Sequence, residues 1–515
     1  MNSTPDPHVT ILNSKADGYR GLWYQNHILK SPFKYKYSGG LSTYCAKHRP
    51  FAVYCPEVEK TFFCFGGVHA DYHKKHDLGS RNLDTLKVRG AIYHMVSYYD
   101  HRTGEVPRPT VLLDKETYDA HDNPVISVDD DGFIWIFSTS HGTLRPSYVL
   151  RSLKPYDISR FEQVHPFQKT TDGQEKLITN FSYMQVWHVQ GRGFVYFFTG
   201  YESWRRKTYF ATSEDGVIWS PWIKLADIDE GHYQISAVHG TKAGTAFNYH
   251  PKGKGLDWRT NLYYMETLDF GQTWQAADGT PLSLPVTQVH NPALVHDFQR
   301  EGLLVYLKDI VFDDAGRPLI LFVTSRGYEP GPKNDPRTWM LARWTGQRWE
   351  IHPITTSDNN YDTGSLYVEP DGTLRIIAPT EVGPQPFNPG GEIAMWTSHD
   401  LGRTWEKKRQ LTANSRRNHS YIRRPVNANP CFYALWADGN GREPSESFLY
   451  YCDQSGNVFM LPPEMSEEYE KPGLVRREAW LTAPGFSSCS GRSTMSPRGS
   501  CNSPPYSRGR DIKSS

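Results

Sequence analysis

Residues 267–274 read TLDFGQTW and residues 398–405 read SHDLGRTW, so both fit the pattern S/T-x-D-x-G-x-T-W. Residues 213–219, SEDGVIW, carry the same pattern shortened by one residue. In such a motif the Asp caps the backbone of a turn between strands, the Gly adopts a positive φ, and the Trp packs between neighbouring units. Three copies of this Asp box predict repeated β-hairpins, and they serve turns rather than catalysis.

Around these motifs, the chain after about residue 40 alternates between strand and turn signals and has almost no stretch of helical period. Hairpin-sized units recur at roughly residues 43–115, 124–170, 181–224, 233–277, 305–355, 363–413 and 420–461. The repetition predicts an all-β fold, a seven-bladed β-propeller, because radial closure hides the sheet edges that an open array would expose. Six and eight blades stay open as alternatives to seven.

Three parts of the chain differ in composition. We expect residues 1–42 to form an N-terminal segment that packs on the propeller or helps to close it, and residues 43–462 to form the propeller itself. Beyond them the composition shifts to Ser, Arg, Gly and Pro, as in SSCSGRSTMSPRGSCNSPPYSRGRD at 487–511. Such a composition cannot bury a core, and it predicts a disordered tail over residues 463–515.

The overall composition excludes several classes of partner. The net charge of +1 gives no reason to expect nucleic acid or a membrane surface. No apolar run approaches the roughly 20 residues of a membrane-spanning helix. The 15 Trp, 31 Tyr and 24 Phe supply large, stiff side chains, which on an exposed groove would also suit stacking against sugar rings.

One hairpin gathers histidines. In the stretch DAHDNPVISVDDDGFIWIFSTSHGTLR, residues 119–145, the segment 129–132 signals a turn between two β-rich runs. If Val128 pairs with Phe133, then His121 lies opposite Ser140 and beside His141, since paired residues are about 5 Å apart. We therefore expect two histidines to meet at the open end of this hairpin.

The same count places polar and aromatic residues at the equivalent point of the later units. In the third unit Tyr183 falls opposite Gly200, and in the seventh His419 falls near Asp438. The other candidates at this rim are His232, Tyr233, Tyr249 and His250 of the fourth unit, Arg326 of the fifth, and Glu381, near Asn360, of the sixth. Because the hairpins of a propeller all point the same way, these ends should share one rim, and such a rim predicts a binding or catalytic mouth.

At this point the sequence resembles the BNR-repeat propeller proteins that include ulvan lyases and the rhamnosyl-glucuronate lyases acting on gum arabic side chains. The resemblance covers roughly residues 17–461. It is carried by GYRGLWY at 18–24, KYSGGLSTYCAKHRPFAVY at 36–54, DAHDNPVIS at 119–127, STSHG at 138–142, RTNLYY at 259–264 and NHSYIRRP at 418–425.

The resemblance implies a polysaccharide lyase that cleaves a bond at C4 of a uronic acid, glucuronate or iduronate next to rhamnose, by β-elimination. His121 and His141 match the family's histidine pair, and Tyr183 in FSYMQ matches its tyrosine. The implied roles are Tyr183 as proton donor, Tyr183 or His141 as base, and His121 as support for the substrate carboxylate.

One position departs from the family pattern. Family members often carry Arg or Lys where this chain has Gly200, so Arg206 or its neighbour Arg205 would have to supply the charge. The residues expected to bind the uronate-containing oligo- or polysaccharide are Arg205, His232, Tyr233, Tyr249, Arg326, Glu381, His419 and Arg423.

The resemblance requires no cofactor for the elimination. Related propellers hold structural calcium or zinc, but no ligand cluster in this sequence has diagnostic spacing, so the metal stays open. Relatives that degrade large glycans are secreted. The N-terminal residues 1–21 nevertheless lack the basic and long apolar regions of a signal peptide, which leaves a cytoplasmic location open as well.

Two other functions fit the same fold. A sialidase-like glycoside hydrolase would use an arginine triad, conceivably Arg326, Arg423 and Arg424, with a tyrosine nucleophile and Glu381 as the acid. A glycan-binding propeller without catalysis would use the aromatic mouth as a lectin site. The products separate the three functions, because only a lyase creates a conjugated unsaturated uronate.

Overall fold

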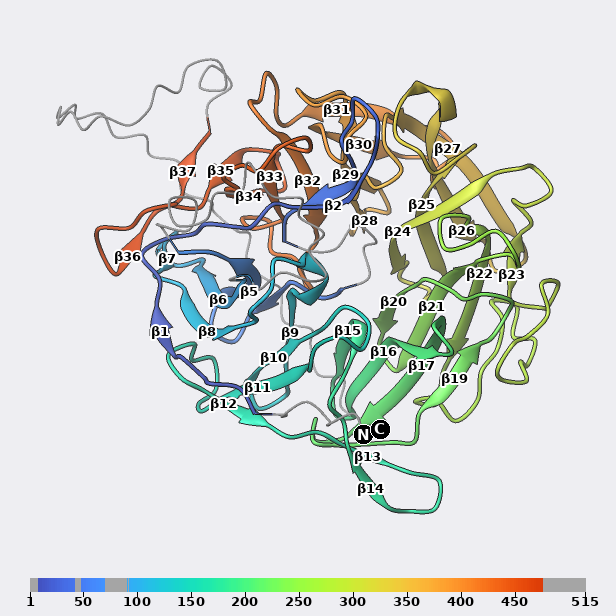
Figure 1. The fold of residues 1–515 in the computed structure, drawn as a ribbon, viewed down its shortest axis with the longest axis horizontal. Coiled ribbons are helices and arrows are strands. Elements are labelled where there is room, and N and C mark those ends of the chain that lie inside the picture. The colour runs from blue at the N-terminus through green and yellow to red at the C-terminus, as the bar shows by residue number, and fades with distance from the viewer. Residues whose placement is uncertain (1–7, 42–47, 70–89, 91, 476–515) are drawn as a thin grey trace, which may run out of the picture.

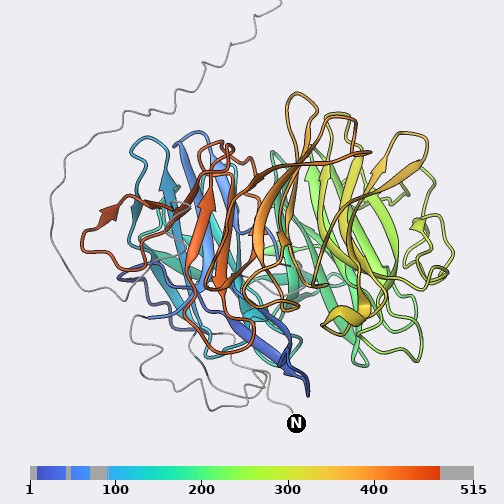
Figure 2. The same cartoon turned by 90° about the horizontal axis from the view of Figure 1, so that it is seen from above.

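A computed structural model describes residues 8–41, 48–69, 90 and 92–475 of the protein. Its sheets follow one another around a central axis (Figure 1), and seen from the side their strands run roughly along that axis (Figure 2). The described residues contain no α-helix, only two 3-10 helices, η1 (Ala120–Asp122) and η2 (Pro332–Asn334). The prediction of an all-β propeller is therefore confirmed.

Seven sheets have four or five strands each. From the centre outward, the first holds β4 (Ala52–Cys55), β5 (Lys60–Gly67), β6 (Tyr93–Asp100), β8 (Thr110–Asp114) and β1 (Ser14–Lys15). In the same direction, the second holds β9 (Pro124–Val128), β10 (Ile134–Ser138), β11 (Tyr148–Ser152) and β12 (Phe161–Val164). The third holds β15 (Ser182–Val189), β16 (Gly193–Glu202), β17 (Arg205–Ser213) and β19 (Ile223–Ala226).

The remaining large sheets continue the ring in the same order. The fourth holds β20 (Gln234–His239), β21 (Lys242–Tyr249), β22 (Thr260–Thr267) and β23 (Leu294–His296). The fifth holds β24 (Leu304–Phe312), β25 (Pro318–Ser325), β26 (Arg337–Trp344) and β27 (Trp349–Ser357). The sixth holds β28 (Ser365–Val368), β29 (Leu374–Glu381), β30 (Glu392–Ser398) and β31 (Glu406–Gln410). The seventh holds β32 (Asn418–Arg423), β33 (Ala434–Gly439), β34 (Leu449–Cys452), β35 (Val458–Met460) and β37 (Gly473–Leu474).

Three smaller sheets add to this ring. They pair β13 (Phe167–Lys169) with β14 (Glu175–Leu177) and β18 (Ile218–Trp219), β2 (Tyr24–Ile28) with β3 (Tyr35–Gly39), and β7 (Val106–Pro107) with β36 (Tyr469–Glu470). Counted with the three-stranded one, the described chain has eight sheets of three or more strands, so the expected number of seven is corrected to eight. The sequence count missed this sheet because β13 pairs in parallel with β18, a partner some fifty residues away rather than across a hairpin turn.

The two ends of the described chain meet at the first and seventh sheets. Near the N-terminus, β1 joins the first sheet through β8, and the Tyr19 amide donates to the carbonyl of Pro462 at 2.9 Å. Near the other end, β36 pairs with β7 and β37 pairs with β35. Residues 463–475, expected to be disordered, thus belong to the folded ring, because their backbone completes sheet edges; the rest of the expected tail, 476–515, lies outside the described residues.

The Asp boxes have the predicted geometry. In the box of residues 267–274, Asp269 accepts from the Thr273 amide at 2.9 Å, and Gly271 has φ +96°. The Trp274 ring lies 5.0 Å from the ring of Phe210 in the preceding sheet. The motif therefore joins a turn to the contact between sheets, as expected.

Two hairpin registers differ from the expected ones. Val128 pairs with Ile134 rather than Phe133, because Asp129 closes a longer turn by accepting from the Phe133 amide through its side chain at 2.8 Å. In the third sheet Val186 pairs with Tyr196, and a β-bulge between Ser182 and Gln185 takes Tyr183 out of the ladder, so it does not lie opposite Gly200. Both shifts bear on the site, because they decide where His141 and Tyr183 point.

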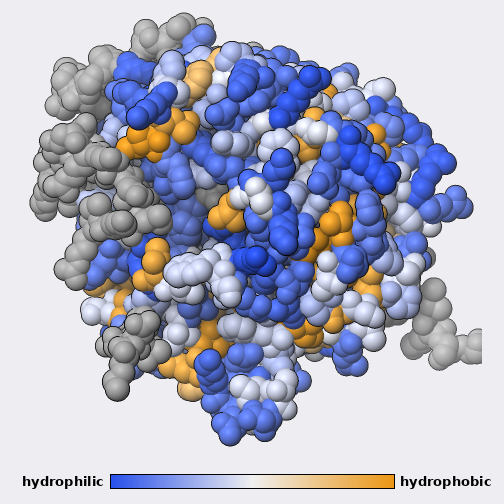
Figure 3. Space-filling view, turned by 45° about the vertical axis from the view of Figure 1, so that its right-hand side comes forward, coloured by the Kyte–Doolittle hydropathy of each residue, from blue (hydrophilic) through white to orange (hydrophobic). Residues whose placement is uncertain are grey.

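The core is divided among the contacts between sheets, as the radial arrangement requires. The largest buried cluster includes six tyrosines that come from different parts of the ring, Tyr37, Tyr183, Tyr233, Tyr306, Tyr361 and Tyr421. The surface seen in Figure 3 is mostly hydrophilic, with small separate hydrophobic patches. Among the described residues, no helix is long and apolar enough to span a membrane.

Candidate active site

The site begins at η1, which lies between β8 and β9. Asp119 stands just before this turn and accepts from the His121 amide at 3.0 Å, which caps the turn. The other half of the site is the loop after β10, where the His141 amide donates to Asp122 at 2.7 Å. Two short local bonds thus fix the backbones of both histidines.

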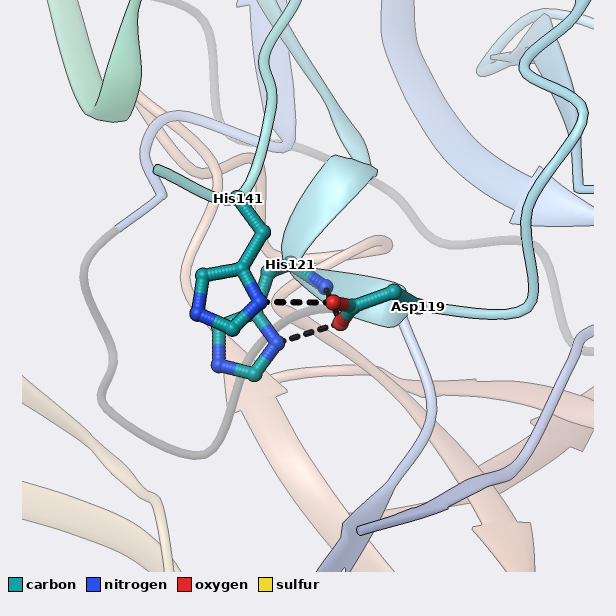
Figure 4. Close-up of side chains that lie close together, drawn as sticks. All are labelled: Asp119, His121 and His141. Atoms are coloured by element: carbon teal, nitrogen blue, oxygen red, sulfur yellow. Dashed lines mark hydrogen bonds and ion pairs between the residues drawn. The ribbon is translucent and has the colours of Figure 1, made fainter. Parts of the chain in front are cut away.

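One carboxylate holds both imidazole rings (Figure 4). His121 Nδ1 is hydrogen-bonded to Asp119 Oδ1, and His141 Nδ1 is bonded to Asp119 Oδ2 at 2.6 Å. The rings are stacked, with centroids 3.9 Å apart and planes 10° apart. Arg145 closes the group through Asp122, with 2.6 Å between Arg145 Nε and Asp122 Oδ2. We call these five residues, Asp119, His121, Asp122, His141 and Arg145, the histidine cluster.

The electrostatics of the histidine cluster assign its protons. Burial by itself would raise the pKa of Asp119, but its interactions with His121 and His141, which include a hydrogen bond from each ring, hold it well below its usual value, so the carboxylate is ionised. Burial lowers the pKa of His121 to about 4 against the opposing charge of Asp119. A neutral imidazole that donates through Nδ1 carries a lone pair on Nε2, so His121 presents an acceptor on the side away from Asp119.

The same three side chains are also a candidate metal group, since Asp119, His121 and His141 each offer a ligand atom within 4.8 Å of the others. Both Nδ1 atoms, however, already hydrogen-bond to the carboxylate. The Nε2 lone pairs of parallel rings 3.9 Å apart run side by side instead of converging on one point about 2 Å from each nitrogen. As arranged, the trio suits the handling of protons better than the coordination of a metal.

Tyr183 faces the two histidines. Its ring centroid lies 5.9 Å from that of His121 and 6.4 Å from that of His141, in edge-on orientation to both. Tyr183 has φ +52° inside the bulge of β15, a conformation uncommon for a bulky residue, and the bulge turns the side chain toward the site. Neither the bulge nor its direction can be read from the alternation of residues.

His48 supports Tyr183 from behind. The two rings stack at 5.7 Å with planes 11° apart, and His48 Nε2 hydrogen-bonds to Thr139 Oγ1 at 3.1 Å. Thr139 in turn donates to the carbonyl of His121. Burial lowers the pKa of His48 well below its usual value, and the charge of Arg423 adds to this effect, so the ring is neutral.

Two arginines supply positive charge beside the tyrosines. Arg206 of β17 lies over Tyr233, with 5.4 Å from its guanidinium carbon to the ring centroid. Arg259, just before β22, lies over the same ring at 4.5 Å. They are 9% and 3% exposed, respectively. The charge of Arg206 also reaches His121, where it helps to lower the pKa of that residue.

Gly200 cannot carry the charge found there in relatives of the resembled family. A Cβ at Gly200 would lie 2.5 Å from Cε2 of the Tyr209 ring, so any side chain would displace that ring. Gly200 pairs with Lys207, one residue away from the pair between Tyr201 and Arg206. The positive charge at this hairpin is therefore supplied by Arg206 of β17.

Of the remaining residues that were expected at the site, two lie beside it and two are exposed to solvent. Tyr233 is beside the site, 5.6 Å from the Tyr183 ring, and His250 is 5.3 Å from Tyr233. Arg205 and Arg326 are exposed, and Arg205 lies next to the tip of the β16–β17 hairpin.

The others point elsewhere. His232 accepts from the Ile228 amide and donates to the Asn248 carbonyl, and Tyr249 donates to Gln299, so both are held inside their own sheet. His419 pairs with Asp438 as expected, but its ring is buried between Trp436 and Ser415. The carboxylate of Glu381 lies 3.1 Å from Lys407 of the outermost strand β31, and Arg423 is buried deeper in the centre of the ring.

Sequence reasoning missed several members of the site. Asp119, Asp122 and Arg145 lie within the hairpin stretch, and His48 and Arg259 lie within two of the motifs that carry the family resemblance. Their presence in those motifs was the available signal. What the sequence could not supply was the fact that one aspartate serves both histidines, since this depends on the loop after β10 folding back over η1.

Comparison with known proteins places this geometry in a family context. The chain is 23% identical over 354 residues to an ulvan lyase of Nonlabens ulvanivorans, which covers 61% of this chain and 70% of that protein. It is also 23% identical over 331 residues to an ulvan lyase of Alteromonas sp. (strain LOR), over 56% of this chain and 64% of that one.

Solved structures show the same fold. A PL25 ulvan lyase bound to -[GlcA(1-4)Rha3S]- superposes with a TM-score of 0.60 at 16% identity, over 87% of this chain and 97% of the other. The polysaccharide lyase Uly1 superposes with a TM-score of 0.57 at 12% identity, over 84% and 97%. The model of the BNR repeat-containing family matches residues 71–357. Because that match spans more than half of the chain, this protein belongs to the BNR repeat-containing family.

Proposed function

We propose that the protein is a polysaccharide lyase that cleaves the bond at C4 of a uronic acid, glucuronate or iduronate next to rhamnose, by β-elimination. The main support for this proposal is that the single carboxylate of Asp119 holds two histidine rings, and that Tyr183 faces these rings. The substrate class is supported by the relatives named ulvan lyases and by the GlcA-Rha3S segment in the related structure.

The base in this proposal is His141. Its side chain is 14% exposed, whereas that of His121 is 1% exposed, so His141 is the histidine that a sugar can reach. When His141 Nε2 removes the proton from C5, the new imidazolium is stabilised by the ionised Asp119 at 2.6 Å from its Nδ1. The neutral His121 keeps its place against the other oxygen of the same carboxylate.

The substrate carboxylate is assigned to Arg206, with Arg259 behind it. Removal of the C5 proton places negative charge on the carboxylate, and a cation beside it makes this charge tolerable. His121 was expected to take this part, but a neutral ring bonded through Nδ1 presents a lone pair, which a carboxylate would repel. The two arginines are always charged at neutral pH, and they suit this role better.

Tyr183 is the proton donor. As the C5–H and C4–O4 bonds break and the C4=C5 double bond forms, the Tyr183 hydroxyl gives its proton to the departing O4. The proton held on His141 then returns the tyrosinate to its neutral form, so no water is consumed. The edge-on position of Tyr183 against both histidine rings supports this short return path.

The test is the formation of a conjugated double bond. The purified protein is incubated with ulvan, gum arabic and other uronate-bearing glycans, and the ultraviolet absorbance of the unsaturated uronate is followed. We expect a rise that Tyr183→Phe and His141→Gln abolish. Tyr249→Phe is the matched control, because Tyr249 is an equally buried tyrosine whose hydroxyl donates to Gln299 away from the site.

Other outcomes would favour the alternative functions. New reducing ends without the absorbance rise would indicate a hydrolase and contradict the lyase proposal. The acid considered for a hydrolase, Glu381, is paired with Lys407, which gives that function little support. Binding of a glycan with neither signal would indicate a lectin-like propeller.

A further inference from the structure

A second group of charged residues lies deeper in the centre of the ring. A cavity of about 10 Å³, enough for one water-sized species, is lined by Arg49, Arg423, Arg424 and Asp309. Arg49 precedes β4, Asp309 lies in β24, and Arg423 ends β32, so the lining comes from innermost strands of different sheets. We call these four residues the arginine cluster.

The arginine cluster lies beyond Tyr183 along the innermost strands. The Arg49 carbonyl accepts from the Val186 amide at 3.0 Å, and Trp187, four residues after Tyr183, also lines the cavity. At about 3.3 Å per residue of strand, four residues correspond to roughly 13 Å along the axis. The residues that line the cavity therefore differ from those of the histidine cluster, although the charge of Arg423 reaches His48.

The charges that line this cavity do not balance. Three guanidinium groups face one carboxylate among the described lining residues. That carboxylate is fully engaged, since Asp309 pairs with Arg49 at 2.7 Å and also accepts from the amides of Ile310 and Leu366, each at 2.8 Å. Arg424 Nε is 4.0 Å from Asp309, too far for a hydrogen bond.

An aromatic ring lies close to each guanidinium group. The guanidinium carbon lies 5.3 Å from the ring centroid of Trp187 for Arg49, 5.7 Å from that of Phe51 for Arg423, and 5.8 Å from that of Tyr367 for Arg424. Within the described structure, the buried atoms Arg49 Nη1 and Arg424 Nε have no hydrogen-bond partner. Buried charged donors of this kind are costly unless an acceptor completes them.

We infer that the arginine cluster is an internal binding site for one small monovalent anion of the size of chloride. Such an ion would accept from Arg49 Nη1 and Arg424 Nε and would reduce the repulsion among three like charges. A cavity of about 10 Å³ matches a single small ion better than a sulfate or a sugar carboxylate. The electrostatics agree, because burial and then the charge of Arg49 lower the pKa of Arg423 to about 9.

The anion would act on the closure of the ring. Arg49 belongs to the start of the first sheet and Arg423 to the end of β32 in the seventh, and these sheets also join through the Val426 amide, which donates to the Ala52 carbonyl at 2.8 Å. An ion held between the two arginines would therefore connect the first sheet to the last. This role does not depend on the proposed lyase activity.

The experiment is thermal unfolding of the whole protein in sodium chloride and in sodium gluconate at equal ionic strength. Gluconate is too large for the cavity, so it controls for general screening. We expect the midpoint to rise saturably with chloride, by about 2 °C between micromolar and 0.2 M chloride, and not with gluconate. Arg423→Gln should lose this rise, whereas Arg300→Gln, a change at an exposed arginine, should keep it.

Equal responses to chloride and gluconate would overturn the inference, and the cavity would then hold water. If Arg423→Gln fails to fold, crystals of the wild-type protein soaked in bromide decide the question by anomalous scattering. A bromide peak between Arg49 and Arg423 supports the site. Its absence there, with bromide bound elsewhere on the protein, contradicts it.

Discussion

The histidine cluster and the arginine cluster lie in the same ring, yet their charges are arranged in opposite ways. In the histidine cluster each buried carboxylate is shared among several donors, so that Asp119 holds two imidazoles and Asp122 holds Arg145. In the arginine cluster a single carboxylate lies among three guanidinium groups and pairs closely with only one of them, that of Arg49. A saturated network fixes protons and directions, which suits catalysis, whereas an excess of buried cation needs a counter-ion from outside the chain.

The largest effect, a loss of kcat, should follow from a change that breaks the hydrogen bonds of the histidine cluster. In Asp119→Asn the amide can accept from only one imidazole, and the histidines lose the arrangement in which both Nδ1 atoms bond to one carboxylate and Nε2 points away from it. We expect kcat for the unsaturated product to fall by about 10³ to 10⁴, as for other aspartates that orient a catalytic histidine. The measurement is the initial rate of the absorbance rise, with circular dichroism to check the fold.

Asp131→Asn, a change in the exposed turn of the same hairpin, is the control and should leave kcat unchanged. A loss of less than tenfold in folded Asp119→Asn would mean that Asp119 does not orient the base.

The next effect concerns the contribution of the arginine cluster to the stability of the protein. Asp309→Asn leaves the buried guanidinium of Arg49 without its carboxylate, which should lower the free energy of unfolding by about 3 to 5 kcal/mol in gluconate buffer. Chloride should recover part of this loss, because the site then has a greater excess of positive charge. Denaturant unfolding in the two salts measures both quantities. A change below about 1 kcal/mol would show that Asp309 is not needed to balance the cluster.

A smaller effect concerns the dependence of protein stability on pH, to which the buried histidines contribute. Burial lowers the folded-state pKa of His232, as of His121, to about 4, below the value of 6.5 in the unfolded chain. The unfolded state therefore binds more protons below pH 6.5, and stability falls as the pH drops from 6.5 toward 4. At pH 5 each such histidine lowers the free energy of unfolding by about 2 kcal/mol.

His232 is the cleaner probe because its ring bonds only to neutral backbone groups, whereas His121 is tied to Asp119. In His232→Gln the difference in unfolding free energy between pH 7 and pH 5 should shrink by about 2 kcal/mol. The exposed His290 provides the matched variant, His290→Gln. An unchanged pH dependence in His232→Gln would mean that its pKa is not lowered by folding.

The smallest effect lies outside both clusters. Trp204 is 90% exposed at the tip of the β16–β17 hairpin, where it and Ser203 both have positive φ, and Arg206 follows two residues later. An exposed indole beside the mouth suits stacking on a sugar ring. Trp204→Ala should raise KM about 2- to 12-fold with little change in kcat or stability. A fall in kcat instead would mean that the hairpin tip takes part in placing Arg206.

The repeat pattern could be predicted because its chemistry is local. An Asp box of eight residues contains its own cap, its own glycine and its own tryptophan, so TLDFGQTW predicts the same turn wherever it occurs. The pairing of His121 with His141 was also within reach, since both lie on one hairpin. Counting hairpins failed for the sheet of β13, β14 and β18, because β13 pairs in parallel with β18, some fifty residues away.

The sequence by itself determined the all-β repeat, its Asp boxes and the meeting of two histidines on one hairpin, because these depend on turn chemistry and on residues close in the chain. Only the tertiary structure decided that Asp119 serves both rings, that the bulge of β15 turns Tyr183 toward them, and that Arg49, Asp309 and Arg423 meet. The reason is physical: bulges and the approach of strands hundreds of residues apart are fixed by closing the ring, and closure has no local signature in the sequence.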